Sequence, residues 1–223
     1  MKLIEYPDRE ALVLQLAQDI AGRLRQALRS DGRATLCLPG GSTPAPLFSQ
    51  LSELQLEWDR VIVFPGDERC VPPADARSNA RLVRHQLMQG PAAAAQFIDL
   101  FTGTGTPEEE AAAATERLAP ALPITVLLLG MGEDMHVASL FPDNDGTAAA
   151  LDAGAPSVVA IRSEALAEPR LTLSGPALKT AMDPHLMIFG AAKRAALERA
   201  AKLPPAQAPV RALWGDLNVH WAE

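Results

Sequence analysis

The chain has 223 residues, of which 48% are hydrophobic, and its formal net charge at pH 7 is −7. This charge, without any long basic run, argues against nucleic acid or an anionic membrane as the main partner. The length and apolar fraction predict one domain over residues 1–223. Because no apolar stretch reaches the roughly 18 residues of a membrane span and no secretory signal pattern opens the chain, we expect a cytoplasmic protein.

Strand and helix patterns alternate along the chain. Short apolar runs bounded by turn residues predict strands over 2–6, 34–38, 61–64, 97–100, 124–129, 158–161, 171–173 and 186–189. Helices are predicted over 9–31, 44–54, 79–88, 107–118 and 191–202, with Asp8, Thr43, Ser78 and Thr106 as the expected N-caps. This alternation implies right-handed βαβ units and a mostly parallel sheet, which binds ligands at the carboxyl ends of its strands.

The first polar segment at such a strand end is a glycine loop. The strand over 34–38 runs into Gly40 and Gly41, then Ser42 and Thr43, and then a helix start. Backbone N–H groups and the helix dipole at this place favour an anion such as phosphate. The loop has neither the Walker A ending nor the GxGxxG pattern. An ordinary capped turn is the alternative reading.

Charged residues follow the next strand. Asp67 or Glu68 can bind a hydroxyl group or assist a proton transfer, and Arg69 can hold them or a substrate oxygen. A solvated salt bridge is the alternative. Cys70 comes next and can act as a nucleophile only if the fold brings a histidine beside it. Cys37 lies in an apolar run and is expected in the core.

A histidine follows the strand over 124–129. Gly130 and Gly132 allow a sharp exit from this strand, and Asp134 and His136 come directly after them. The sequence therefore places His136 at the carboxyl end of a parallel strand, where histidine can act as a base near neutral pH. Asp134 can orient its ring or polarise water. A purely structural histidine is the alternative.

Two cations complete the candidate site. Arg170 precedes the strand over 171–173, and Lys193 follows the strand over 186–189 at the start of a helix. A cation at a helix start is unfavourable unless an anion compensates it. We therefore expect both side chains to converge on the anion of the glycine loop, with simple surface exposure as the alternative.

Taken together, these segments resemble the 6-phosphogluconolactonase family. The matching segments are LPGGSTP at 38–44, GDERCVP at 66–72 with Ser78-Asn79 after it, and GMGEDMHVASLFP at 130–142, with weaker matches around Arg170 and Lys193. The resemblance covers nearly the whole chain in order. It implies a three-layer α/β fold with a mostly parallel sheet and helices on both faces, a modified Rossmann-like arrangement as in glucosamine-6-phosphate deaminase.

The resemblance also implies an activity, the hydrolysis of 6-phospho-D-glucono-1,5-lactone in the oxidative pentose phosphate pathway, with no metal or organic cofactor. His136 would activate water and then protonate the ring oxygen, with support from Asp134. Asp67 and Arg69 would line the sugar end. The expected phosphate ligands are Gly40, Gly41, Ser42, Thr43, Arg170 and Lys193. We expect a phosphosugar lactone as the partner, no nucleic acid or membrane, and a monomer or weak homo-oligomer.

Two other functions fit the same segments. One is an aldose–ketose isomerase or deaminase acting on an amino-sugar phosphate, although the Asp67-Glu68-Arg69 and Ser139-Leu140-Phe141-Pro142 stretches resemble the lactonase branch. The other is a sugar-phosphate-sensing domain of a transcription regulator, which would need a DNA-binding helix-turn-helix. The acidic net charge of the chain argues against that reading.

The histidine loop departs from the family pattern at one position. The family usually has Asp-Gly-His where this chain has Asp134-Met135-His136. Methionine tolerates positive φ poorly. We therefore expect a relaxed loop, in which Met135 has a backbone conformation open to any residue.

Overall fold

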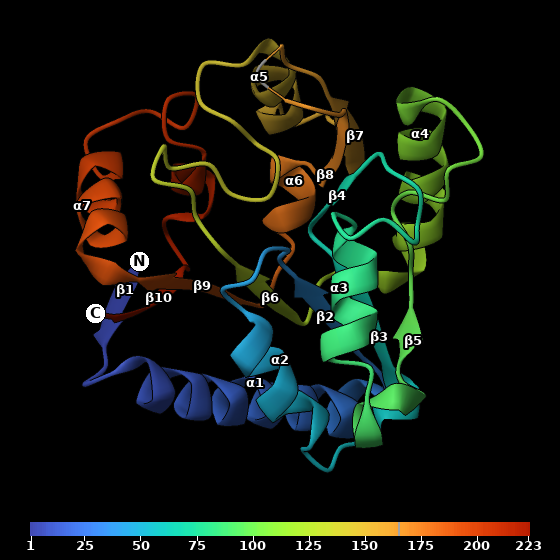
Figure 1. Cartoon of the computed structure of the whole chain (residues 1–223), viewed down its shortest axis with the longest axis vertical. Coiled ribbons are helices and arrows are strands. Elements are labelled where there is room, and N and C mark those ends of the chain that lie inside the picture. Colours follow the sequence, from blue (N-terminus) through green and yellow to red (C-terminus); the bar gives the residue numbers. More distant parts are fainter. Residues whose placement is uncertain (165) are drawn as a thin grey trace.

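The computed structural model describes residues 1–164 and 166–223. A seven-stranded sheet runs through the middle of the molecule, in the order β1-β10-β9-β6-β2-β3-β5 (Figure 1). Its strands are β1 (Lys2–Glu5), β2 (Ala34–Leu38), β3 (Val61–Pro65), β5 (Gln96–Phe97), β6 (Val126–Leu129), β9 (Asp183–Phe189) and β10 (Asn218–Ala222). All neighbours pair in parallel, so the predicted parallel sheet is confirmed.

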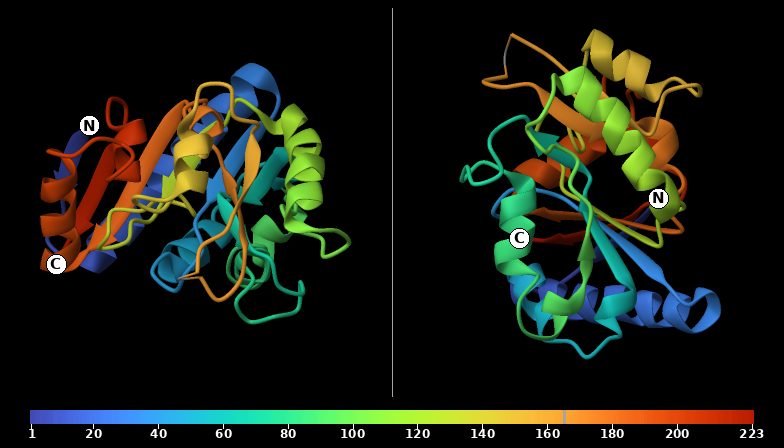
Figure 2. Two further views of the ribbon diagram at one scale, coloured as in Figure 1. Left: turned by 90° about the horizontal axis from the view of Figure 1, so that it is seen from above. Right: turned by 90° about the vertical axis from the view of Figure 1, so that its right-hand side faces the viewer.

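Helices cover both faces of this sheet, which gives the expected three layers. The helices are α1 (Arg9–Asp31), α2 (Ala45–Ser52), α3 (Asn79–Gln86), α4 (Pro107–Leu118), α5 (Asp145–Leu151), α6 (Gly175–Leu178) and α7 (Gly190–Ala200). Short 3₁₀ helices occupy Trp58–Arg60, Gly90–Ala94, Ala119–Ala121 and Pro209–Leu213. In the right-hand view of Figure 2, α1 lies below the sheet and α4 and α5 lie above it.

Alternating side chains of the central strands fill two separate cores. Val126 and Leu128 of β6 pack with α1, α2 and α3, whereas Leu127 and Leu129 pack with α4, α6 and α7. Successive side chains of a strand point to opposite faces of its sheet. A strand that is apolar at every position, as β6 is, therefore belongs between two helical layers.

A second sheet lies beside the carboxyl ends of the main strands. It pairs β4 (Asp67–Arg69), β8 (Arg170–Leu173) and β7 (Val158–Ile161) in antiparallel fashion. The sequence indicated strands over 158–161 and 171–173 but no separate sheet, and it treated 67–69 as a loop. The missing signal is physical: all three residues of β4 are charged, so no apolar alternation marks it as a strand.

Most predicted helix boundaries are confirmed. Asp8 caps α1, accepting a hydrogen bond from Ala11 N at 2.8 Å, and Thr106 forms a capping box with Glu109 at the start of α4. The predicted Thr43 cap is wrong, because α2 begins at Ala45 after Pro44 and has no side-chain cap. The sequence also missed α5 and β10. The first is short, and in the second Asn218 and His220 interrupt the apolar pattern of a buried strand.

A buried chain of polar groups joins the last strands at one edge of the sheet. Tyr6 Oη lies 2.8 Å from His220 Nδ1, and His220 Nε2 lies 2.9 Å from His185 Nδ1. His185 Nε2 is in turn 3.0 Å from Asp183 Oδ2. Burial, together with His185, lowers the pKa of His220 to about 3. His220 is therefore neutral at physiological pH and links β10 to β9 by hydrogen bonds.

A buried carboxylate anchors the loop that precedes α4. Glu110 is 3% exposed and accepts hydrogen bonds from the backbone and hydroxyl groups of Thr102 and Thr104, at 2.7 to 3.1 Å. Burial alone would raise the pKa of Glu110, but these hydrogen bonds outweigh it and lower the pKa to about 2. The charged form of Glu110 is thus the one that the folded loop requires.

Replacing Glu110 by Gln should reduce the free energy of unfolding at pH 7 by roughly 1–3 kcal/mol, because backbone donors lose a charged acceptor. A pKa below its unfolded value contributes stability above about pH 4.5, and this contribution disappears as pH falls towards 2. The difference between wild type and Glu110→Gln should therefore shrink over that range in urea unfolding. Glu116→Gln, on the exposed side of the same helix, is the control; a pH-independent difference would contradict the assignment.

Candidate active site

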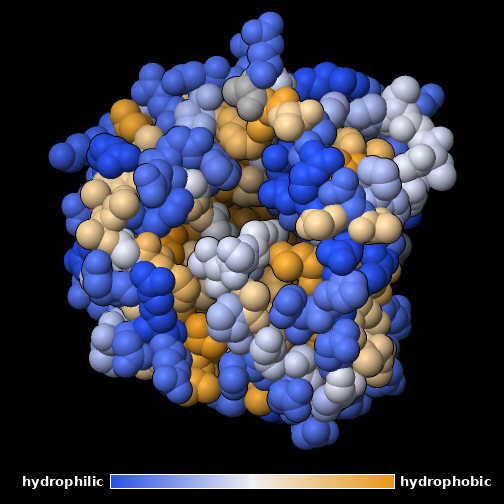
Figure 3. Space-filling view, viewed as in Figure 1, coloured by the Kyte–Doolittle hydropathy of each residue, from blue (hydrophilic) through white to orange (hydrophobic). Residues whose placement is uncertain are grey.

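A cavity of about 430 Å³ lies at the carboxyl ends of β2, β3, β6 and β9. The space-filling view shows the molecule hollowed near its centre at this face (Figure 3). Each of the four segments singled out in the sequence contributes to its lining. The expected site residues that line it are Gly40, Gly41, Thr43, Asp67, Arg69, His136, Arg170 and Lys193.

The glycine loop reaches the cavity through its backbone. Gly41 has φ +86°, and a Cβ on Gly40 would lie only 1.9 Å from Asn79 Oδ1, so neither position suits a side chain. Thr43 lines the cavity, whereas Ser42 is exposed and lies outside its lining. The loop therefore presents backbone groups rather than the Ser42 hydroxyl to the cavity.

The histidine loop folds tightly on itself. His136 Nδ1 lies 2.6 Å from Asp134 Oδ1, and the imidazole packs against the Phe141 ring at 4.9 Å between centroids. A Cβ on Gly132 would lie 2.2 Å from both Asp134 Oδ1 and His136 Nδ1, so this backbone position must be bare. Because the Asp134 carboxylate accepts a hydrogen bond from Nδ1–H, the proton of the neutral ring stays on Nδ1. The Nε2 lone pair of His136 is therefore available as a base.

Met135 shows that the expectation of a relaxed loop is wrong. Its φ is +72°, in the left-handed region that favours glycine. Its N–H donates to Gly132 O at 3.0 Å, and its carbonyl accepts from Val210 N at 3.3 Å. Arg199 adds a hydrogen bond to Glu133 O at 2.9 Å. Tertiary contacts from the segment around the end of α7 thus hold a conformation that methionine disfavours.

The two acidic residues of β4 point in different directions. Asp67 lines the cavity, but Glu68 faces the start of α3. Glu68 accepts hydrogen bonds from Asn79 N, Ala80 N, Arg69 N and Ser78 Oγ at 2.7 to 3.0 Å. Burial raises the pKa of Glu68, and these bonds oppose the rise. Glu68 is therefore a buried cap of α3, and Asp67 alone offers a carboxylate to the cavity from this strand.

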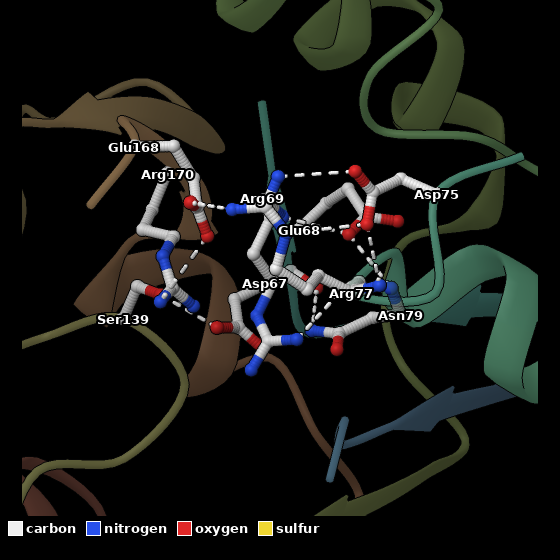
Figure 4. A network of polar contacts seen from close by, with 9 residues as sticks. All are labelled: Asp67, Glu68, Arg69, Asp75, Arg77, Asn79, Ser139, Glu168 and Arg170. Carbon is white, nitrogen blue, oxygen red and sulfur yellow. Dashed lines mark hydrogen bonds and ion pairs between the residues drawn. The ribbon is translucent and has the colours of Figure 1, made fainter. Parts of the chain in front are cut away.

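Two arginines are paired on neighbouring strands of the second sheet. Arg69 on β4 is directly opposite Arg170 on β8 (Figure 4). Within the described residues, the Nε atoms of both are buried without a hydrogen-bond partner, and the carboxylate nearest Arg170 is Glu168, at 3.8 Å. Burial, and then the charge of Arg69, lower the pKa of Arg170. Like charges in register repel each other, so an anion in the cavity would relieve this pair.

Lys193 lies on the first turn of α7 and lines the cavity from the side of β9. Over residues 1–164 and 166–223 it has no carboxylate within salt-bridge distance, unlike its neighbour Arg194, which pairs with Glu5 at 2.6 Å. Its position near the positive end of a helix dipole is unfavourable for a cation. A bound anion would compensate both the helix and the lysine.

Neither cysteine belongs to this site. Both Cys37 and Cys70 are outside the cavity lining. Burial raises the pKa of Cys70 to about 11 and raises that of Cys37 well above its usual value, so both are thiols at neutral pH. Across the described part of the chain, no three His, Cys, Asp or Glu side chains are grouped so that they could hold a metal ion. No helix there is long and apolar enough to cross a membrane.

Sequence reasoning missed several groups of the lining. Asn79 stood within a matched segment but carried no assigned role, although it contacts both the glycine loop and Asp67. Met131, Phe141 and Leu166 add apolar walls. Apolar side chains of this kind look like core residues in a sequence, so only the fold places them beside a cavity.

Comparisons with known proteins identify the family of the chain. The family model of glucosamine-6-phosphate isomerases/6-phosphogluconolactonases matches residues 7–221. The chain belongs to this family. It is 39% identical to a 6-phosphogluconolactonase of Rhizobium meliloti, over 100% of this chain and 98% of that protein. It is 42% identical to a 6-phosphogluconolactonase of Pseudomonas aeruginosa, over 92% and 88%.

Solved structures share the fold. The crystal structure of a 6-phosphogluconolactonase from Shewanella baltica superposes with a TM-score of 0.96 at 32% identity, covering 100% of this chain and 98% of that one. A structure described as a putative 6-phosphogluconolactonase from Neisseria gonorrhoeae gives 0.91 at 30% identity, with full coverage of both chains. The expected three-layer α/β fold and the family resemblance are therefore confirmed.

The strain at Met135 can be measured by comparing two variants. In left-handed backbone, glycine avoids the penalty of about 1–2 kcal/mol that a Cβ brings. Met135→Gly should therefore be more stable than Met135→Ala by about 1 kcal/mol in urea unfolding, although glycine normally costs 0.4–1 kcal/mol through the unfolded chain.

The control is Met182, which is exposed and does not have positive φ. There the alanine variant should be the more stable of the pair. The same order at Met135 would show that its backbone is not strained.

Proposed function

We propose that this protein hydrolyses 6-phospho-D-glucono-1,5-lactone to 6-phospho-D-gluconate, a step of the oxidative pentose phosphate pathway. The observation that carries the proposal is His136 on the wall of a cavity that also contains three cationic side chains, with Asp134 behind it, outside the lining, at 2.6 Å from Nδ1. A base and an anion site in one cavity fit a phosphorylated ester substrate. The relatives described above, which are 6-phosphogluconolactonases, support the same substrate.

The phosphate of the substrate would lie against the glycine loop. Backbone N–H groups around Gly40, Gly41 and Thr43 suit an anion, and Lys193 and Arg170 would supply the charge. Within the described residues Lys193 has no carboxylate within salt-bridge distance, and Arg170 has only Glu168, at 3.8 Å. The sugar end would then lie near Asp67, which can accept a hydrogen bond from a ring hydroxyl.

Hydrolysis would proceed through one histidine. His136 Nε2 takes a proton from water as the water oxygen bonds to the lactone carbonyl carbon, and Asp134 stabilises the imidazolium that forms. Arg69 or backbone N–H groups would stabilise the oxyanion of the tetrahedral intermediate. The imidazolium then gives its proton to the ring oxygen as the bond from that oxygen to the carbonyl carbon breaks. The products are the open acid and a neutral His136.

The assay must separate lactonase activity from the rival functions of the same family. We expect enzyme-dependent consumption of 6-phosphogluconolactone, corrected for spontaneous hydrolysis, and no ammonia release from glucosamine 6-phosphate. The activity should persist in EDTA, because the proposed steps use only His136, Asp134 and the binding groups. Ammonia release would establish the deaminase, and phosphosugar binding without turnover would favour the sensing domain.

His136→Ala should lower kcat by about 10²- to 10⁴-fold, the usual contribution of a general base. The KM for the lactone should change much less, because the phosphate contacts remain. His85→Ala, an exposed histidine on α3, is the matched control and should behave as wild type. A variant at His136 with wild-type kcat would exclude it as the base.

Lys193→Ala should raise KM roughly 10- to 100-fold, which corresponds to one lost charge-assisted hydrogen bond. The phosphate is remote from the reacting carbonyl and is bound in ground and transition states alike, so kcat should change little. The preference for the phosphorylated over the unphosphorylated lactone should fall in parallel. Lys202→Ala, in the exposed turn just after the far end of α7, is the control. An unchanged preference in Lys193→Ala would remove Lys193 from the phosphate site.

A further inference from the structure

The carboxylate of Asp67 is held from two sides by buried hydrogen-bond donors (Figure 4). Ser139 Oγ donates to Oδ2 at 2.5 Å, and Asn79 Nδ2 donates to Oδ1 at 3.1 Å. Asp67 itself is 8% exposed and opens onto the cavity. Each carboxylate oxygen therefore has one fixed partner, and its remaining lone pairs are free for a substrate.

The two donors are themselves fixed by their surroundings. Ser139 is 0% exposed, and its N–H donates to Thr172 Oγ1 on β8 at 3.2 Å. Asn79 is 2% exposed, and its Nδ2 also donates to the Asp67 backbone carbonyl at 2.8 Å. It is so close to Gly40 that any side chain there would collide with it. The backbone of Ser139 is thus held against β8, and the Asn79 side chain is held between β4 and the glycine loop.

These contacts connect three parts of the cavity wall. Ser139 stands three residues after His136 on the same loop, so its bond to Asp67 sets the distance between the histidine loop and β4. Asn79, at the start of α3, connects the same carboxylate to the glycine loop. The base, the sugar end and the phosphate loop therefore meet at Asp67.

In the described structure the charged groups around Asp67 form no hydrogen bond with its carboxylate, so the two neutral donors alone hold it. Arg170 on β8 faces Asp67 closely enough to interact with its charge, but no hydrogen bond joins them in the described structure. Glu68 is turned towards α3, and Cys37 on β2 is a buried thiol. Arg69 donates to the Arg77 carbonyl rather than to Asp67.

We propose that Ser139 and Asn79 are positioning residues, which act on the reaction by fixing the Asp67 carboxylate at the sugar end of the cavity. This inference rests on the lactonase activity proposed above. Neither residue needs to touch the substrate. A carboxylate free to rotate would bind the sugar hydroxyl in several orientations, and only one of them presents the carbonyl carbon to the water activated by His136.

The first test compares the kinetics of serine variants. Ser139→Ala should lower kcat for 6-phosphogluconolactone roughly 10- to 100-fold, the usual cost of a small misplacement of reacting groups. KM should stay within about threefold, because the phosphate contacts are intact. Ser139→Cys, which keeps a weak donor of similar shape, should lie between Ala and wild type. Ser52→Ala is the control, since Ser52 is buried but donates only to Ser49 O within α2.

A double-mutant cycle separates positioning from a general effect on folding. If Ser139 acts through Asp67, Ser139→Ala should change kcat by less than about twofold in the Asp67→Ala background, because the interaction partner is already absent. A full additive loss in that background would overturn the proposal. Near-ultraviolet circular dichroism checks that each variant keeps its tertiary packing.

Asn79 provides the second, independent arm. Asn79→Asp keeps the shape of the side chain but places a second carboxylate 3.1 Å from Asp67, where like charges repel. We expect it to lose more kcat than Asn79→Ala, and this order should vanish in the Asp67→Ala background. If folded Asn79→Asp and Ser139→Ala variants both have wild-type kcat, the positioning role is overturned while the proposed lactonase function stands. A wild-type enzyme without lactonase activity would instead overturn the proposed function.

Discussion

Parallel pairing is the constraint on which the whole site depends. When β9, β6, β2 and β3 run in the same direction, every one of them must leave the sheet at the same edge. The glycine loop, Asp67, His136 and Lys193 follow those four strands and so meet without any of them being near another in sequence. The apolar strands, buried on both faces, make this arrangement stable and leave the chemistry to the loops.

The sequence was sufficient for those parts of the site that directly follow main-sheet strands. His136, Gly40, Gly41 and Lys193 could be placed because glycine and cap signals mark where an apolar strand ends. The second sheet could not be predicted. For that reason the sequence also did not reveal that Arg69 lies opposite Arg170, or that Asp67 and Glu68 point in opposite directions. Neighbouring side chains of a strand point to opposite faces, so a prediction of β4 would have placed the two carboxylates on different sides. Because all three residues of β4 are charged, no apolar pattern marked it as a strand.

Met135 illustrates a different limit of sequence reasoning. Local preference argued for a relaxed loop, but the backbone of this residue is fixed by Gly132, by Val210 and by the packing of Asp134 and His136 on bare backbone. Two further residues of the same loop, Ala138 and Asp143, also have positive φ. Strain concentrated in this way is common where the surroundings must hold one functional geometry. Part of those surroundings is distant in sequence: Val210 and Arg199 lie more than 60 residues after the loop.

The place of β10 between β1 and β9 has a consequence for the synthesis of the chain. In the described part of the chain β1 is an end strand of the sheet and pairs with β10, with Lys2 in register with Asn218. Its neighbour Tyr6 bonds to His220. Residues 2–5 therefore leave the ribosome more than 200 residues before their partner strand exists. Once β9 (183–189) has been made, it too has one open edge until β10 follows at 218–222, and such an edge is a place where nascent chains can associate wrongly. Closing so long a loop is entropically slow, so this edge of the sheet should be the last part of the molecule to form.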